Sequence, residues 1–241
     1  MGHWADERLD AGGVRHVVWD WNGTLFDDHV AVVAAINDAL ASLSFRPIDS
    51  HTYRTHYTRP VQRFYEQVAG RPIAPGEWRT LDDAYHDSYS AWLERLELAP
   101  DAWVALAAAE AAGLTQSLLS MWRHRDLVAL VERLGVGRFF LRVDGLRVPG
   151  GGGKTEHLLA HLAALEVEAS AALLVGDTLD DLAAARAVGA RCVLYDGGSH
   201  HRSALEATGV PVVDSLTAAV AAGAGRASRR RPGSARHRPA R

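Results

Sequence analysis

The sequence contains one cysteine, Cys192, and one lysine, Lys154. A single cysteine cannot form a disulfide within the chain, and it excludes the multi-cysteine clusters that hold structural zinc. There is no uninterrupted apolar run of the roughly 18 residues that would span a bilayer. The N-terminal stretch 1–13 also lacks the basic start and apolar centre of a signal peptide. We therefore expect a cytoplasmic protein with no membrane partner.

Charge is unevenly distributed along the 241 residues. Seven arginines and no acidic residue lie in the tail 223–241, so removing that tail takes the net charge from −3 to −10. The acidic remainder argues against a nucleic-acid-binding face on the folded part. The tail itself lacks the large apolar residues needed to fold. We predict flexible termini at 1–13 and 223–241, and any contact with nucleic acid is expected from the basic tail alone.

Strand-like and helix-like segments alternate in the second half of the chain. The first strand is expected at Val14–Asp20, followed by the turn Asn22-Gly23 and by a helix that Asp27 or Asp28 can cap. The other predicted strands are Leu114–Ser120, Phe139–Val143, Ala171–Gly176, Arg191–Tyr195 and Pro211–Val213, and the predicted helices between them are Asp126–Leu134, Lys154–Leu165 and Asp180–Val188. This alternation predicts an α/β fold with a doubly wound, Rossmann-like parallel sheet covered on both faces.

The stretch between the first two strands has a different pattern. It is helical throughout, is interrupted by several prolines, and has no convincing strand. It is therefore expected to be an α-helical cap inserted after the first strand. The predicted division is a core made of 14–27 and 104–222 and a cap made of 28–103.

Polar residues gather where the predicted strands end. Asp20, Ser120 and Asp177 each close or follow a strand, and Asp180 and Asp181 come just beyond. In an open parallel sheet, ligands bind beyond the carboxyl ends of the strands. Carboxylate oxygens suit a hard cation such as Mg²⁺. The alternative for Asp180 and Asp181 is that they cap the following helix.

Lys154 stands out because arginine supplies every other basic residue of the chain. Arginine is a rigid planar fork, whereas lysine is a compact point charge that can sit between a carboxylate and a phosphate. A chain so biased toward arginine indicates a need for an ammonium group at this position.

Four segments, in this order, resemble the four motifs of the haloacid dehalogenase superfamily. Asp20 to Asp27 (DWNGTLFD) is similar to the first motif, Ser120 stands where the second motif has Ser or Thr, Lys154 matches the third-motif lysine, and Gly176 to Asp181 (GDTLDD) is similar to the fourth. The resemblance covers nearly all of the chain before the tail. It is to the phosphatase-like branch with a helical cap, of the phosphoglycolate phosphatase kind.

The resemblance implies a cytoplasmic hydrolase that cleaves a small organic phosphate monoester with Mg²⁺ as cofactor. Asp20 would attack phosphorus to form a phosphoaspartate that water then hydrolyses. The implied catalytic residues are Asp20, Asn22, Ser120 and Lys154. The implied metal ligands are Asp20, Asn22 (through its backbone carbonyl), Asp177 and Asp181. The residues expected to bind the substrate are Gly23, Thr24, Ser120, Arg59 and Lys154.

The cap is expected to set the substrate. Arg54, Arg59 and Arg63 lie close together in sequence, with Pro60 stiffening a turn among them. Such arginines can grip a second anionic group, although a solvated charged face explains them equally well. The sequence does not choose among phosphoglycolate, sugar phosphates and other phosphorylated metabolites, and it gives no oligomeric state.

Asn22 departs from the family pattern, in which phosphatases carry a second Asp that protonates the leaving group. An amide cannot do this, and loss of a general acid costs about 10²–10⁴ in rate. Three explanations remain open: a leaving group that needs little protonation, a donor from elsewhere, or a protein that binds without turnover. Replacement of Asn22 by Asp is expected to restore the acid. The candidate donors are His29, His51, His56 and His124.

Other activities fit less well. Dehalogenases of the family work without a metal, which leaves the segment Gly176 to Asp181 unexplained, and phosphonate hydrolases need a cap lysine that is absent. A mutase would also need the missing acid. The run GGGGKT at 150–155 invites a P-loop reading, but that motif requires Gly where Val148 stands. The preceding segment Asp144–Arg147 is also expected to be a turn rather than a strand.

Overall fold

The computed structural model describes residues 13–148 and 152–224. Six parallel strands form one sheet in the order β3-β2-β1-β4-β5-β6. They are β1 (His16–Trp19), β2 (Thr115–Arg123), β3 (Val143–Leu146), β4 (Ala172–Gly176), β5 (Arg191–Tyr195) and β6 (Val212–Val213). The chain winds outward from β1 through β2 and β3, then returns to the other side of β1 with β4. The predicted doubly wound α/β fold is confirmed, and its topological switch point lies between β1 and β4.

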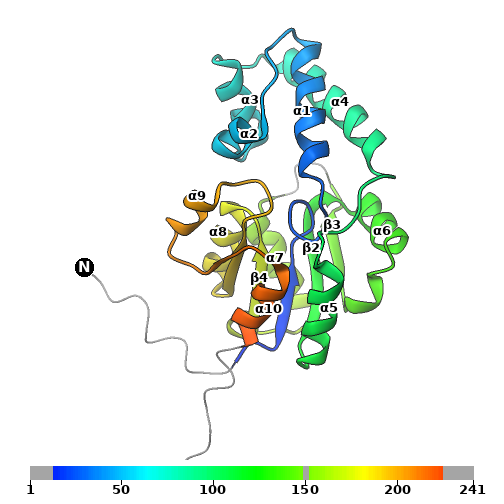
Figure 1. Cartoon of the computed structure of the whole chain (residues 1–241), viewed down its shortest axis with the longest axis vertical. Coiled ribbons are helices and arrows are strands. Elements are labelled where there is room, and N and C mark those ends of the chain that lie inside the picture. The colour runs from blue at the N-terminus through cyan, green and yellow to red at the C-terminus, as the bar shows by residue number, and fades with distance from the viewer. Residues whose placement is uncertain (1–12, 149–151, 225–241) are drawn as a thin grey trace, which may run out of the picture.

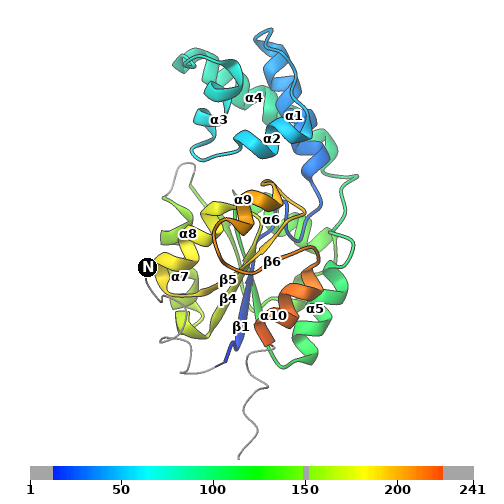
Figure 2. The ribbon, with the colours of Figure 1, turned by 60° about the vertical axis from the view of Figure 1, so that its left-hand side comes forward.

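Helices cover both faces of the sheet (Figure 2). One face carries α5 (Ala102–Ala111), α6 (His124–Arg133) and α10 (Leu216–Ala224), and the other carries α7 (Lys154–Ala164), α8 (Leu179–Val188) and α9 (Arg202–Glu206). The side chains of β1 alternate between these layers: Val17 and Trp19 join the first, and Val18 joins the second. All four residues of β1 are buried, as its apolar run predicts for a central parallel strand.

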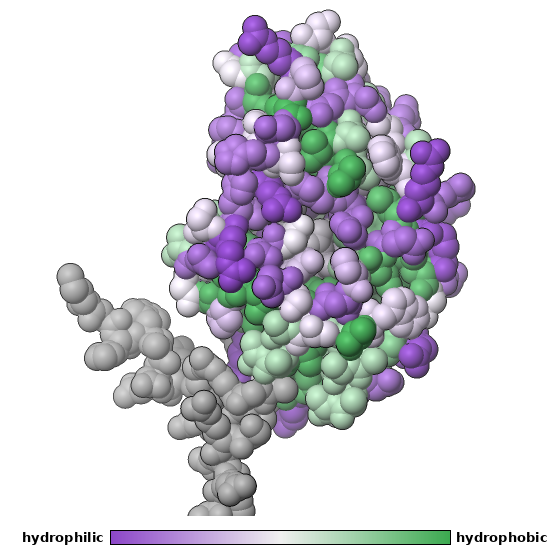
Figure 3. Space-filling model, in the orientation of Figure 1, coloured by the Kyte–Doolittle hydropathy of each residue, from purple (hydrophilic) through white to green (hydrophobic). Residues whose placement is uncertain are grey.

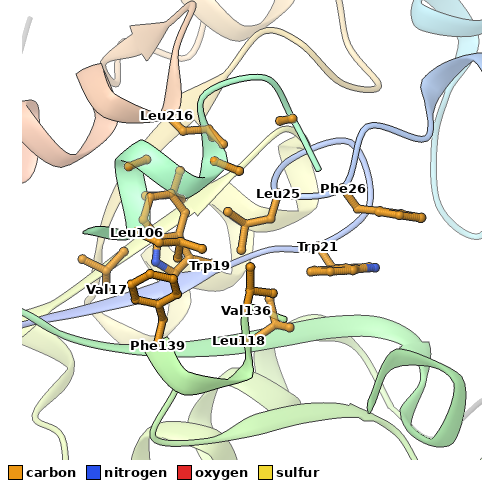
Figure 4. Packing of buried hydrophobic residues seen from close by; sticks show 14 of the residues in the cluster. Val17, Trp19, Trp21, Leu25, Phe26, Leu106, Leu118, Val136, Phe139 and Leu216 are labelled. Carbon is orange, nitrogen blue, oxygen red and sulfur yellow. The ribbon is translucent and has the colours of Figure 1, made fainter. Parts of the chain in front are cut away.

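Trp19 anchors the first layer (Figure 4). Its ring lies among Leu106 of α5, Phe139 and Val17. The indole nitrogen donates to Oε1 of Gln116 at 2.9 Å, and the Gln116 amide donates to the backbone carbonyl of Leu106 at 3.0 Å. The Trp19 indole and the Gln116 side chain therefore have hydrogen-bond partners within the protein, which offsets the cost of burying them.

The predicted strand Phe139–Val143 is wrong over most of its length. Gly137–Phe139 is a single 3₁₀ turn, and pairing with β2 places Val143 opposite Leu118. Phe139 is buried against Trp103, with ring centroids 5.7 Å apart, whereas Leu141 is 67% exposed. The segment contains several apolar residues, as a strand would, but here they belong to a loop in which Phe139 packs against Trp103 and Leu141 faces solvent. The turn predicted at Asp144–Arg147 is also wrong, because its first three residues belong to β3.

The insertion between β1 and β2 forms a separate helical layer at one end of the molecule (Figure 1). It contains α1 (His29–Ser42), α2 (Ser50–His56), α3 (Val61–Ala69) and α4 (Pro75–Trp92). These helices share an apolar cluster that includes Leu40, Phe64 and Leu81. On the face drawn in Figure 3, hydrophilic residues cover much of this layer, with apolar residues scattered between them.

The ends of the described chain add two facts. Helix α10 runs to Ala224, two residues beyond the predicted core boundary. Of the predicted flexible termini, 1–12 and 225–241 lie outside the described residues. Within 13–148 and 152–224, none of the helices has the length and apolarity to cross a membrane.

Candidate active site

Three carboxylates meet at the switch point of the sheet. Asp20 follows β1, Asp177 follows β4, and Asp181 lies in the first turn of α8. One oxygen from each lies within 4.8 Å of the others, and all three residues are buried. Thr178 orients Asp181 through a capping box, since its backbone N–H and its hydroxyl both donate to Oδ2 of Asp181, at 2.9 and 2.5 Å. The side chains that were expected to meet at the carboxyl ends of the parallel strands therefore do lie together in the structure.

Lys154, the first residue of α7, supplies a positive charge to this cluster. Its Nζ contacts Oδ1 of Asp20 and Oδ1 of Asp181, and its side chain is only 8% exposed. Burial alone would lower the pKa of Lys154, but the carboxylates of Asp181 and Asp20 outweigh it and hold the pKa above its usual range. The ammonium group therefore stays charged, which a buried lysine without such partners would not.

The cluster carries more negative than positive charge. Burial raises the pKa of Asp20, and the charges of Asp181 and Asp177 raise it further against the lowering effect of Lys154. Burial and the charge of Asp181 likewise raise the pKa of Asp177. One ammonium cannot balance three buried carboxylates. An all-oxygen donor set with this charge deficit fits a divalent cation.

Glycines allow the backbone to approach Asp177 closely. Gly23 has φ +71°, and a Cβ on Gly198 would lie 2.1 Å from Oδ2 of Asp177. The next residue, Ser199, donates its backbone N–H to Oδ2 at 2.6 Å, and the Thr24 hydroxyl donates to Oδ1 at 3.1 Å. Both oxygens of Asp177 are therefore fixed in position.

Asn22 is held by an unexpected partner. Its amide donates to Oδ2 of Asp28 at 2.7 Å, and the Tyr89 hydroxyl donates to the same oxygen at 2.6 Å. The backbone N–H of Gly23 donates to Oδ1 at 2.8 Å. Asp28 precedes α1, but its side chain makes no capping hydrogen bond, so the predicted capping role is wrong for this residue. The carboxylate turns back toward the site, where burial raises its pKa while these three hydrogen bonds lower it.

A cavity of about 750 Å³ lies between the cap and the carboxyl ends of the strands. Six of the residues predicted for the site line it: Asp20, Asn22, Gly23, Arg59, Ser120 and Lys154. Thr24 is fully buried and engaged by Asp177, so its predicted contact with substrate stays a prediction. Gly153, the N-cap of α7, also lines the cavity, and a helix N-terminus favours an anion.

The cap arginines do not act as one group. Arg59 lines the cavity and lies 3.5 Å from Asp180 of the core. Arg54 instead donates to the backbone carbonyl of Gly197 at 3.0 Å, and Arg63 is exposed. A second anion site built from all three is not present in this arrangement. Contact between Arg59 and substrate remains a prediction.

The four histidines considered as proton donors also separate. Among them, His29 lines the cavity. Burial and the nearby Arg54 lower the pKa of His29 to about 4, so its ring is neutral near pH 7 and a poor acid. The rings of His51 and His201 are tilted relative to each other, with centroids 4.6 Å apart, and His124 accepts from the backbone N–H of Gly145 at 3.2 Å.

Sequence reasoning missed several residues of the site. Gly198 and Ser199 carried a usable signal, because a Gly-Gly-Ser run begins one residue after Asp196, which itself follows β5 at the same sheet edge. Asp28 was noticed only as a helix cap. Nothing in the sequence around Tyr89 indicated a role in the site. It lies near the end of α4 and reaches Asn22 only because this helix runs back toward the core.

The fold and the site together define a capped α/β enzyme with an acidic centre at the switch point. A family model described as haloacid dehalogenase-like hydrolase matches residues 14–189. The chain belongs to this hydrolase family, so the predicted resemblance and the predicted hydrolase class are confirmed.

Individual relatives are distant. A phosphoglycolate phosphatase of Pseudomonas fluorescens is 26% identical over 231 residues, which cover 90% of this chain and 82% of the relative. A ribulose-1,5-bisphosphate 5-phosphatase of Halopiger xanaduensis is 34% identical over 137 residues, 56% of each chain. A haloacid dehalogenase-like hydrolase from Streptococcus pneumoniae superposes with a TM-score of 0.76 at 16% identity, covering 87% of this chain and 98% of that one.

Proposed function

We propose that the chain is a Mg²⁺-dependent phosphatase that hydrolyses an organic phosphate monoester through a phosphoaspartate on Asp20. The observation that carries this proposal is the contact between Asp20 and Lys154 at the wall of the cavity. A nucleophilic carboxylate beside a fixed positive charge suits attack on a phosphoryl group. The curated relatives named above act on phosphate esters, which supports the same class.

In the first step, an oxygen of Asp20 forms a bond to phosphorus while the bond from phosphorus to the ester oxygen breaks. The bonding electron pair leaves with the ester oxygen. Water then attacks phosphorus and displaces the Asp20 oxygen, which yields inorganic phosphate and the free carboxylate. Ser120, whose Oγ accepts from the backbone N–H of Trp122 at 3.1 Å, would donate to a phosphoryl oxygen, and Lys154 would neutralise charge.

Asp20, Asp177 and the backbone carbonyl of Asn22 would hold the metal, with Asp181 nearby. Mg²⁺ would supply positive charge against the phosphoryl oxygens. Asp181 is already engaged by Thr178 and Lys154, so its contribution would be to position the lysine and to add negative charge. We also propose that 14–27 and 104–222 carry the chemistry and that the cap, 28–103, selects the substrate.

The test is release of phosphate from 4-nitrophenyl phosphate by the purified chain with Mg²⁺, with excess EDTA, and with Mg²⁺ restored. Turnover that disappears with EDTA and returns with Mg²⁺ is expected. Trapping of ³²P on the native chain but not on Asp20→Asn would identify the intermediate. Binding of phosphate esters without turnover would instead favour a non-catalytic protein, the role that Asn22 leaves open.

A further inference from the structure

The wall of the cavity changes character away from Asp20. The cap supplies a group of aromatic side chains to it: Tyr57, which follows α2, and Phe64, Tyr65, Trp78, Tyr85 and Tyr89 of α3 and α4. Several are already in contact with one another, such as Phe64 with Tyr65 and Tyr85 with Tyr89, at centroid distances of 5.4 and 5.6 Å. Aromatic walls favour flat, ring-bearing ligands through stacked and edge-on contacts.

The cavity is also long. Along α4, the side chains that line it recur at helical spacing from Tyr89, beside Asn22, to Trp78. Eleven residues at 1.5 Å each place these two positions about 16 Å apart along the helix axis. A two- or three-carbon chain on the phosphate would leave most of the 750 Å³ empty, whereas pockets of this size hold drug-sized molecules.

One polar group lies unused within this aromatic wall. The hydroxyl of Tyr65 is buried and has no hydrogen-bond partner among the described residues, although Tyr65 lines the cavity. A buried hydroxyl without a partner is costly. Because the oxygen is shielded from solvent in this structure, it would pair with a ligand along the cap only if neighbouring cap side chains moved aside.

The hydrogen bonds of Asn22 and Asp28 leave the site without a proton donor for the leaving oxygen, and this indicates which kind of phosphate ester it can cleave. Asn22 has no acidic proton, and Asp28 accepts all three of its hydrogen bonds, from Asn22, Gly23 and Tyr89. Neither residue is arranged to donate to a leaving oxygen. A phenolic oxygen leaves as a stable anion and needs no such donor, whereas an alkoxide does.

We propose, resting on the phosphatase function above, that the substrate is an aryl phosphate whose aromatic part extends beyond one ring along α4. The phosphate occupies the end of the cavity at Asp20 and Lys154. The ring that carries the ester oxygen lies near Tyr89, and the remainder lies among the aromatic residues of α3 and α4.

The native chain tests this with two esters whose phenols have similar acidity, phenyl phosphate and biphenyl-4-yl phosphate. Burial of a second ring is expected to raise kcat/KM about 10- to 100-fold for the biphenylyl ester. Phosphoglycolate and a nucleoside 5′-phosphate, both alkyl esters, are expected to be slower than either. Equal or faster turnover of phenyl phosphate, or of an alkyl ester, would overturn the proposal.

A matched pair of variants on α1 locates the effect. Val32 lines the cavity, whereas Val30 is 69% exposed on the same helix. Val32→Phe is expected to lower kcat/KM for the biphenylyl ester at least about tenfold, and to leave acetyl phosphate, which is too small to reach the wall, within about twofold. Val30→Phe should change neither. Loss of both substrates alike in the folded Val32→Phe chain would contradict a role for the wall in selection.

Failure of the phosphatase function is distinguishable from failure of this inference. If no ester is hydrolysed, the function is wrong and the cavity is then tested by calorimetry with biphenyl-4-yl phosphonate and phenyl phosphonate. Tighter binding of the biphenylyl compound by about tenfold or more would uphold the substrate class. Equal affinity would overturn it.

Discussion

Two buried polar clusters of this molecule look equally able to do chemistry. One is the Asp20, Asp177, Asp181 and Lys154 cluster at the carboxyl ends of β1 and β4. The other runs through the middle of the sheet, where Ser117 of β2, His161 of α7 and Asp144 of β3 have the hydrogen-bond order of a catalytic triad. The Ser117 hydroxyl lies 2.7 Å from Nε2 of His161, and Nδ1 of His161 lies 2.8 Å from Asp144.

The second cluster, which we call the sheet network, also includes His16. Its Nε2 lies 2.7 Å from the Ser117 hydroxyl, and its Nδ1 lies 2.8 Å from the Thr115 hydroxyl. Ser117 is fully buried and none of these residues lines the cavity beneath the cap. The network joins β1, β2, β3 and α7, and its donors and acceptors satisfy one another.

The difference teaches what separates a reactive site from a structural one. Triad geometry is present in the sheet network, but no substrate can reach Ser117. The carboxylate cluster instead opens on a cavity and keeps an unbalanced charge. Access and unbalanced charge, rather than hydrogen-bond geometry, therefore mark the site in this fold.

The largest expected effect is on turnover, and it separates the carboxylate cluster from the sheet network. Asp20→Asn should lower turnover of 4-nitrophenyl phosphate roughly 10⁴-fold or more, because it removes the nucleophile. Ser117→Ala, its matched control, should keep turnover within about threefold and lower the free energy of unfolding by about 1–3 kcal/mol, since two histidines lose a partner. Rates and urea unfolding of both variants decide this. Loss of turnover in a stable Ser117→Ala chain would make the sheet network the active site.

The sequence predicted the first cluster better than the second. Strand ends and the lone lysine located Asp20, Asp177 and Lys154, because the carboxyl ends of parallel strands share one edge. The sheet network was not predicted, since nothing in the order of His16, Ser117 and His161 reveals that their strands and helix are neighbours. Arg59 was the one cap residue predicted for the site, and it lines the cavity. Tyr89 was missed because it reaches Asn22 only after the cap has folded.

The second prediction concerns the missing acid. The expectation that Asn22→Asp restores it overlooks Asp28, because a new carboxylate would replace the amide that donates to Asp28 at 2.7 Å. Two buried carboxylates there would repel each other. Asn22→Asp alone should therefore accelerate alkyl esters less than about tenfold. Asn22→Asp with Asp28→Asn restores a donor–acceptor pair, and should accelerate them by up to about 10²–10⁴.

The measurement is kcat/KM for an alkyl and an aryl phosphate with both variants and with Asp28→Asn alone as the control. A full gain in the single Asn22→Asp chain would show that Asp28 does not oppose the new acid.

Lys154→Arg should have the next largest effect, a loss of roughly 10²-fold in turnover. The charge is kept, but a planar guanidinium cannot occupy the point between Asp20 and Asp181 that the ammonium fills. The rate with saturating Mg²⁺ measures this, and circular dichroism checks that the variant is folded. A near-normal rate would mean that any positive charge on α7 is sufficient.

The smallest effect belongs to the sheet network and is seen in stability rather than in rate. Burial, with the charge of His161, lowers the pKa of His16 to about 4 in the folded chain, whereas an unfolded histidine has a pKa of about 6.5. Between these values the unfolded chain binds more protons, so the His16 contribution to stability is present above pH 6.5 and is lost as pH falls toward 4.

The raised pKa values of Asp20 and Asp177 act in the opposite direction. The pH dependence of the unfolding free energy of the native chain therefore contains both effects. The His16 effect is isolated by comparing the native chain with a variant that lacks this histidine. His16→Gln removes this titration and should flatten the loss of stability between pH 6.5 and 4. The free energy of unfolding is measured by urea unfolding at each pH for the native chain and for His16→Gln. If the two plots of this free energy against pH are parallel from pH 6.5 to 4, the sheet network does not couple folding to proton binding.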